Sequence, residues 1–221
     1  MYKRQGEHQP WEPILAVAAE RGADVVVCGT RGHGPVARSV LGSTSSSLLH
    51  HADRAVLVVP EAELPLAGPA LIAYDGSPAA DEAIAAAGRL LPGKSAFMVN
   101  VWESPLRHSV SGRALSGAPL AEIREVTGDF ETWLREVAEA TVADGVGLAR
   151  KAGLEASGEA VESSSTAWRA LIATAETRDA AVIVAGSQGH GRVASVLLGS
   201  VSAGLVHHAE RPVLIIRAPA P

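Results

Sequence analysis

Two glycine-rich segments have residue types and a spacing suited to binding a phosphate group. Each carries two glycines three positions apart, then nine residues, then a Gly-Ser pair: Gly29, Gly32, Gly42 and Ser43 in the first, Gly186, Gly189, Gly199 and Ser200 in the second. Glycine lets the backbone approach a ligand closely and adopt positive φ. A helix starting at the Gly-Ser pair would add a serine N-cap, unpaired N–H groups and a dipole that favours an anion. The plainer alternative is a loop that needs its glycines only to turn.

Both segments belong to an internal repeat. Residues 11–60 align with residues 168–217 at a constant offset of 157, without a gap. Trp11 falls on Trp168, and the run His50-His51-Ala52 falls on His207-His208-Ala209. A gap-free match of this kind indicates that one supersecondary unit occurs twice.

The elements that position the second segment alternate between strands and helices. The pattern predicts strands over 69–75, 95–102, 154–161, 180–186 and 212–217, and helices over 78–91, 119–151, 165–178 and 200–208. Ser77 is the expected N-cap of the helix that begins at Pro78. Strands that are apolar almost throughout, alternating with helices, indicate a parallel sheet covered on both faces.

The first copy contains only the last part of this pattern. Helices are expected over 11–21 and 43–51, and strands over 23–28 and 55–59, which is too little to close a core. The sequence therefore predicts a partial domain at 1–60, a linker at 61–68 and a complete domain at 69–217. The partial domain must lean on the complete one or on another chain, and something must cover the sheet edge beside strand 23–28.

Composition excludes several classes of protein. Hydrophobic residues make up 47% and charged residues 19% of the 221 residues, which is enough apolar material for a packed core. A net charge of −5 and an aromatic content of 4% argue against a nucleic-acid partner. The polar first residues predict no signal peptide, and no apolar run is long enough to cross a membrane. The single cysteine, Cys28, lies in an apolar run, so a reducing compartment, the cytoplasm, is expected.

Two motifs imitate other kinds of site. The runs GHGPVA at 32–37 and GHGRVA at 189–194 resemble a dinucleotide-binding fingerprint. In that motif an acidic residue stands at the end of the next strand, whereas Asp53, the acidic residue at about the right distance from the first run, stands before a strand. The two histidines of each His-His pair, at 50–51 and 207–208, are adjacent on a helix and point about 100° apart, which does not suit a shared metal ion. They stand at the end of a short helix, so they are expected to interact with its C-terminus. No metal site and no catalytic residue is predicted.

The combined features resemble the universal stress protein family. They are the motif G-x2-G-x9-G-[ST] in both copies, the strand-ending aspartate in AYDGS, and the closing segments HHAERPVLII and HHADRAVLVV. The resemblance covers nearly all of 69–217 and about the last third of a second domain at 11–60. It implies an α/β fold with a doubly wound five-stranded parallel sheet of order 3-2-1-4-5. It also implies either a homodimer or an intramolecular pairing of the two copies through their last strands.

The resemblance further implies a site for ATP, alone or with Mg²⁺. Asp75 matches the position that holds the ribose, Ala73 a backbone position near the base, and Val101 the adenine pocket. The matching phosphate and ribose contacts are Gly186, Gly189, Gly199, Ser200 and Val201. Ligands of open α/β sheets do bind at the carboxyl ends of the strands where the strand order reverses. A turn formed by Asp75 with Gly76 and Ser77 is the structural alternative, and both roles can hold together.

The first copy offers only an incomplete second site, formed by Gly29, Gly32, Gly42 and Ser43. Another chain supplies the missing half, or the site is empty, or the numbered start lies downstream of the true one. The sequence favours a nucleotide-binding stress-response module with little or no hydrolysis. The alternative is an interaction or dimerisation module of the same fold. A phosphotransferase or ATPase is a third reading, for which no catalytic constellation is found.

Overall fold

The computed structural model describes residues 9–30, 41–62, 67–104, 120–189 and 198–217. Its strands are β1 (Val25–Gly29), β2 (Ala55–Val59), β3 (Ala70–Ala73), β4 (Ser95–Glu103), β5 (Glu155–Ser163), β6 (Val182–Gly186) and β7 (Val213–Ile216). Its helices are α1 (Trp11–Glu20), α2 (Ser43–His51), α3 (Pro78–Leu90), α5 (Leu120–Lys151), α6 (Ala167–Thr177) and α7 (Ser200–His208). Every expected helix and strand is present, with bounds that agree to within about two residues.

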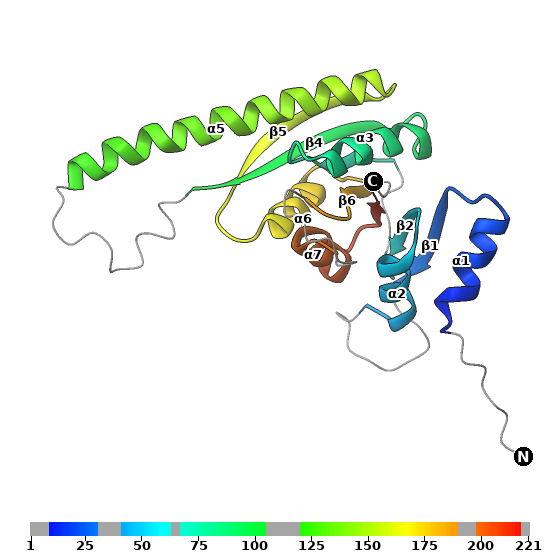
Figure 1. Ribbon diagram of the computed structural model, residues 1–221. Helices are drawn as coiled ribbons and strands as arrows, with labels where there is room; N and C mark the ends of the chain where they lie inside the picture. The colour runs from blue at the N-terminus through cyan, green and yellow to red at the C-terminus, as the bar shows by residue number, and fades with distance from the viewer. Residues whose placement is uncertain (1–8, 31–40, 63–66, 105–119, 190–197, 218–221) are drawn as a thin grey trace, which may run out of the picture.

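All the strands form one seven-stranded sheet in the order β1-β2-β7-β6-β3-β4-β5 (Figure 1). The five strands of the second copy lie in the order 3-2-1-4-5 and pair in parallel throughout. The doubly wound architecture expected from the resemblance is therefore confirmed.

Helices cover both faces of this sheet. One core cluster joins α3 and α5 to the sheet, and a second lies on the opposite face beneath α2, α6 and α7. Helix α3 can lie close to the strands because its buried face consists mostly of alanine. Its N-terminus is fixed as expected, since Ser77 Oγ accepts a hydrogen bond from the N–H of Ala80 and Pro78 occupies the first turn.

The partial first copy is joined to the second copy by strand pairing within the sheet. Strand β2 pairs antiparallel with β7, with Val56 opposite Ile215 and Val58 opposite Val213. The last strands of the two copies are therefore joined within one chain. Because β2 also pairs with β1, and β7 with β6, neither last strand keeps a free edge for a homodimer of the expected kind.

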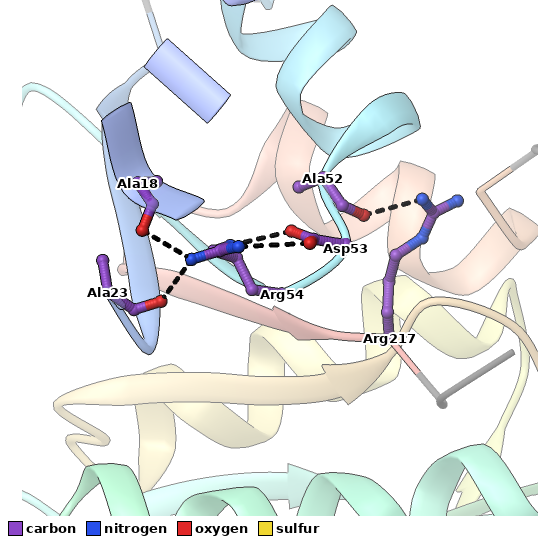
Figure 2. A network of polar contacts seen from close by, with 6 residues as sticks. All are labelled: Ala18, Ala23, Ala52, Asp53, Arg54 and Arg217. Atoms are coloured by element: carbon purple, nitrogen blue, oxygen red, sulfur yellow. Dashed lines mark hydrogen bonds and ion pairs between the residues drawn. The ribbon is translucent and has the colours of Figure 1, made fainter. Parts of the chain in front are cut away.

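Two arginines tie the first copy together and to the second (Figure 2). Arg54 Nη1 donates to the carbonyls of Ala18, at 2.8 Å, and Ala23, at 2.7 Å, and the same guanidinium pairs with Asp53. This hydrogen bonding holds the pKa of Asp53 below its ordinary value. Arg217, which follows β7, donates to the carbonyl of Ala52 at 2.7 Å. Arg217 therefore reinforces the junction between β7 and β2.

The repeated tryptophans and histidines form a structural pair in each copy. The rings of Trp11 and His51 stack with centroids 4.1 Å apart, and those of Trp168 and His208 stack at 4.5 Å. Each stack joins a tryptophan at the start of one helix, the first residue of α1 and the second of α6, to the last residue of another. These histidines therefore pack at helix ends.

No helix in the described part of the chain combines the length and the apolar character needed to cross a membrane.

Candidate functional site

A cavity of about 410 Å³ lies at the carboxyl ends of β3 and β6, where the strand order reverses. The eight residues predicted for the complete site all line it: Ala73, Asp75, Val101, Gly186, Gly189, Gly199, Ser200 and Val201. They come from three strands, the loops that follow β3 and β6, and the start of α7, so the fold brings together segments that are far apart in the sequence. The size is within the range of roughly 300–1,000 Å³ common for small-molecule sites.

Apolar and polar groups both line the cavity. The apolar lining includes side chains that the sequence reading did not single out, namely Val99, Ala167, Leu171, Ala185 and Leu198. The polar lining includes Asp75, the Gly186–Gly189 loop and the first turn of α7. A mixed lining of this kind suits a ligand that has both a flat apolar group and an anionic group.

Asp75 adopts the turn considered as its structural alternative. Its Oδ1 accepts a hydrogen bond from the N–H of Ser77 at 3.0 Å. Its Oδ2 points toward the loop, where a Cβ placed on Gly189 would lie only 2.7 Å away. Asp75 therefore both forms the turn and lines the cavity, so the two roles considered for it hold together.

The start of α7 differs from expectation in one respect. The N-cap is Gly199, with φ −60° and ψ 157°, and Ser200 is the first helical residue. In the first copy Gly42 is likewise the N-cap, and Ser43 begins α2. The prediction that the serines cap these helices is therefore wrong: a glycine cap has no side chain to accept from the first-turn N–H groups. At α7 this leaves a helix N-terminus without a side-chain cap beside the cavity.

A second serine fixes each helix start to the end of its strand. Ser202 Oγ donates to the carbonyl of Gly186 at 2.6 Å, and Ser45 Oγ donates to the carbonyl of Gly29 at 2.7 Å. The N–H of Gly199 also donates to the carbonyl of Ser187 at 2.8 Å. The sequence reading missed these serines, although their repetition at the offset of 157 was a usable signal.

Tyr74 forms a buried link beneath the site. Its Oη donates to Asp81 Oδ1 at 2.8 Å, its ring lies against Gly145 of α5, and its carbonyl accepts from Asn100 Nδ2 at 2.9 Å. Burial, followed by the hydrogen bond to Asp81, raises the pKa of Tyr74 well above its ordinary value. The phenol therefore stays protonated at neutral pH and serves as a donor.

The described lining residues include no lysine or arginine. An anion in this cavity would therefore be met by backbone N–H groups and the α7 dipole, with a divalent cation as a further source of positive charge. Among the residues placed by the structure, no group of three or more His, Cys, Asp or Glu side chains is arranged to hold a metal ion by itself.

The incomplete site of the first copy is placed only in part. Gly29 ends β1, Gly42 caps α2 and Ser43 follows it, as in the second copy. Gly32 lies outside the described residues. No described strand or helix takes the place that β3 and α3 occupy beside β6, so these glycines lack the wall that closes the cavity of the second copy.

Comparison with known proteins shows the family. The sequence profile of the universal stress protein family matches residues 2–60 and 68–217. A universal stress protein of Mycolicibacterium smegmatis (strain ATCC 700084 / mc(2)155) is 31% identical over 216 residues, which is 91% of this chain and 64% of that protein. A universal stress protein of Mycobacterium tuberculosis (strain ATCC 25618 / H37Rv) is 30% identical over 200 residues, 88% of this chain and 62% of that protein. The chain belongs to the universal stress protein family and spans a little over three fifths of the length of these relatives.

Solved structures agree on the fold. The crystal structure of a universal stress protein from Archaeoglobus fulgidus DSM 4304 matches with a TM-score of 0.58 and 22% identity, covering 93% of this chain and 65% of that one. A functionally unknown protein from Pseudomonas aeruginosa PAO1 matches with a TM-score of 0.65 and 17% identity, covering 96% and 69%.

Proposed function

We propose that residues 69–217 form a nucleotide-binding domain that holds an adenine nucleotide, ATP in the simplest case, and that residues 1–60 form a partial domain of the same family. The protein would act as a stress-response binding module. The observation that carries this proposal is the single cavity lined by all eight residues of the expected site. The half-buried lone thiol of Cys28 supports the cytoplasm as the compartment.

The chemistry of the lining supports a place for each part of the nucleotide. The base would lie against the apolar side chains of Val99, Val101 and Leu171. The ribose would lie near Asp75 Oδ2, and the phosphates would accept from backbone N–H groups at the start of α7. Mg²⁺ would complement the phosphate charge, because the described lining has no basic side chain.

The same lining supports little or no hydrolysis. Its only described titratable side chains are Tyr74 and Asp75. Tyr74 is held protonated, and Asp75 already accepts from the N–H of Ser77, so neither is arranged as a free general base for attack by water. An interaction module without nucleotide is the second candidate function.

Calorimetric titration of the whole chain with ATP and Mg²⁺ tests the proposal, using Gly199→Asp as the key variant. Asp is a favoured N-cap in the extended conformation of Gly199, so this variant should fold at least as stably as wild type. Its carboxylate would occupy the helix N-terminus in place of phosphate. We expect roughly micromolar binding in wild type and at least about tenfold weaker binding in the variant.

The matched control is Gly42→Asp, the same change at the equivalent cap of the first copy. It should leave a stoichiometry of one nucleotide per chain and the affinity unchanged. A well-folded wild type that binds no ATP would overturn the proposal and favour the interaction module. An equal loss of ATP affinity in both variants would also contradict the assignment of the nucleotide site to the second copy alone.

A further inference from the structure

Strands β3 and β4 separate at the rim of the sheet where the cavity lies. Their last paired residues are Ala73 and Val99, and one further bond runs from the N–H of Tyr74 to the carbonyl of Val99 at 2.9 Å. In a longer parallel ladder, the next bond would run from the N–H of Val101 to the carbonyl of Tyr74. No such bond joins these two described residues. The carbonyl of Tyr74 instead accepts from Nδ2 of Asn100 at 2.9 Å.

Asn100 reaches this carbonyl from one face of the sheet. Successive side chains of a strand point to opposite faces. Met98 packs in the core cluster with α3 and α5, so Asn100 points to that face, whereas Val99 and Val101 pack on the opposite face. Asn100 is the one polar residue between Ala96 and Trp102, so it interrupts an apolar stretch of β4. An apolar side chain at this position could not donate to the carbonyl.

The backbone of Val101 is directed past the end of β3. In a parallel ladder, the N–H and C=O of one residue point to one neighbouring strand, and those of the next residue point to the other. Because the carbonyl of Val99 accepts from Tyr74, the two backbone groups of Val101 also point away from β5. Val101, Ala73 and Tyr74 all line the cavity. A donor and an acceptor therefore lie side by side at its edge.

We propose that Asn100 is a positioning residue of the nucleotide site. By taking the carbonyl of Tyr74, it keeps the N–H of Val101 out of the ladder and leaves both backbone groups of Val101 for the edge of the base. The inference rests on the proposed function, which places the base beside Val101. The group at position 6 of a purine is a donor in adenine and an acceptor in guanine. The carbonyl of Val101 accepts from the first and repels the second, so Asn100 supports selectivity for adenine.

Amide hydrogen exchange in the nucleotide-free chain tests the position of the Val101 N–H. In wild type this N–H should exchange much faster than that of Val99, which lies in the paired part of β4. In Asn100→Ala the carbonyl of Tyr74 loses its donor, and the register makes the N–H of Val101 the backbone group that can replace it. Exchange at Val101 should then slow at least about tenfold.

Calorimetric titration with ATP and with GTP, each with Mg²⁺, tests the effect on the base. Wild type should bind ATP at least about tenfold more tightly than GTP. Asn100→Ala should weaken ATP binding about tenfold and GTP binding by a smaller factor, so that most of the selectivity is lost. Asn100→Asp has the same size but its carboxylate cannot donate, so it should also lower the ratio of the two affinities.

The matched control is Arg150→Ala. It also removes a side-chain donor from a backbone carbonyl, since Nη2 of Arg150 donates to the carbonyl of Ala156 at 3.1 Å. Ala156 is near the start of β5, at the rim of the sheet opposite the cavity. This variant should change neither the exchange rate at Val101 nor the ratio of ATP to GTP affinity.

Three results would overturn the proposal. They are slow exchange at Val101 in the nucleotide-free wild type, exchange at Val101 that Asn100→Ala does not slow, and an equal loss of ATP and GTP affinity in both Asn100 variants. Failure of the proposed function would look different, because wild type would then bind neither nucleotide while Val101 still exchanged fast.

Discussion

The carboxylate of Asp75, at the end of β3, lies directly against Gly189 in the loop that follows β6. A Cβ on residue 189 would be 2.7 Å from Asp75 Oδ2, closer than side-chain atoms can approach without movement. Gly189 is therefore needed here for the space it leaves, and this space lets the ends of β3 and β6 close one cavity.

Gly189→Ala should weaken ATP binding by roughly tenfold with little loss of stability, because Asp75 is exposed and can swing away from the new methyl group. Calorimetry and thermal unfolding would measure the two effects. The matched control is Gly147→Ala on α5, where a Cβ would meet nothing within 4 Å. Unchanged affinity in Gly189→Ala would show that the position of Asp75 does not matter for binding.

Gly204→Ala should destabilise the fold. A Cβ there would lie 2.3 Å from Trp168 Cγ, so the indole must leave its stack on His208. Overpacking of this kind costs about 1–3 kcal/mol, measurable as a lower free energy of unfolding in urea. The counterpart in the first copy is Ser47, where a side chain is already present, so Ser47→Ala should change stability far less. Equal effects would contradict this account.

Stability should fall in alkaline solution through Tyr74. The pKa of Tyr74 is higher in the folded state than in the unfolded state, where it is about 10. The stability that the protonated phenol contributes is therefore complete below about pH 10 and is lost as the pH rises above that value. Burial also raises the pKa of Cys28, which adds a similar dependence. Tyr74→Phe should therefore flatten, without abolishing, the decline in unfolding free energy above about pH 10. A decline as steep as in wild type would exclude Tyr74 as a cause.

Arg217→Ala should loosen the junction between the copies. The variant removes the hydrogen bond from Nη1 to the carbonyl of Ala52, and bonds of this charged type contribute about 1.5–3 kcal/mol. We expect a loss toward the lower limit, since the residue is only half-buried. Urea unfolding measures it, with Arg135→Ala on exposed α5 as the control. An unfolding free energy of Arg217→Ala no lower than that of the Arg135→Ala control would show that the β2–β7 pair holds the copies together without this hydrogen bond.

Two strong patterns made the architecture predictable from the sequence. One is the alternation of apolar strands with helices, and the other is the repeat at an offset of 157, which shows which elements of the two copies correspond. Matching a family motif also predicted eight of the residues that line the cavity, although it missed others such as Val99 and Leu171. Whether the eight residues bind ATP stays a prediction that the titration of Gly199→Asp addresses.

Other features could not be read from the chain. Ser200 was expected to cap α7 because serine favours that position, but the strand end and the bond from Ser202 to Gly186 place Gly199 there instead. The choice between a homodimer and internal pairing depended on tertiary geometry, which joins β2 to β7 within one chain. Tyr74 was missed because its partners, Asp81, Asn100 and Gly145, come from three separate elements.

The reversal of strand direction at the β2–β7 pair determines where two ligands could sit. Strands β1 and β6 end at opposite rims of the sheet, so the glycines that follow them open away from each other. The intervening distance is at least a strand length, about 17 Å for five residues, and physiological salt screens charges beyond about 8 Å. An anion bound at one rim would thus exert little repulsion on an anion at the other. Any communication between the rims would have to be mechanical, carried by the shared strands.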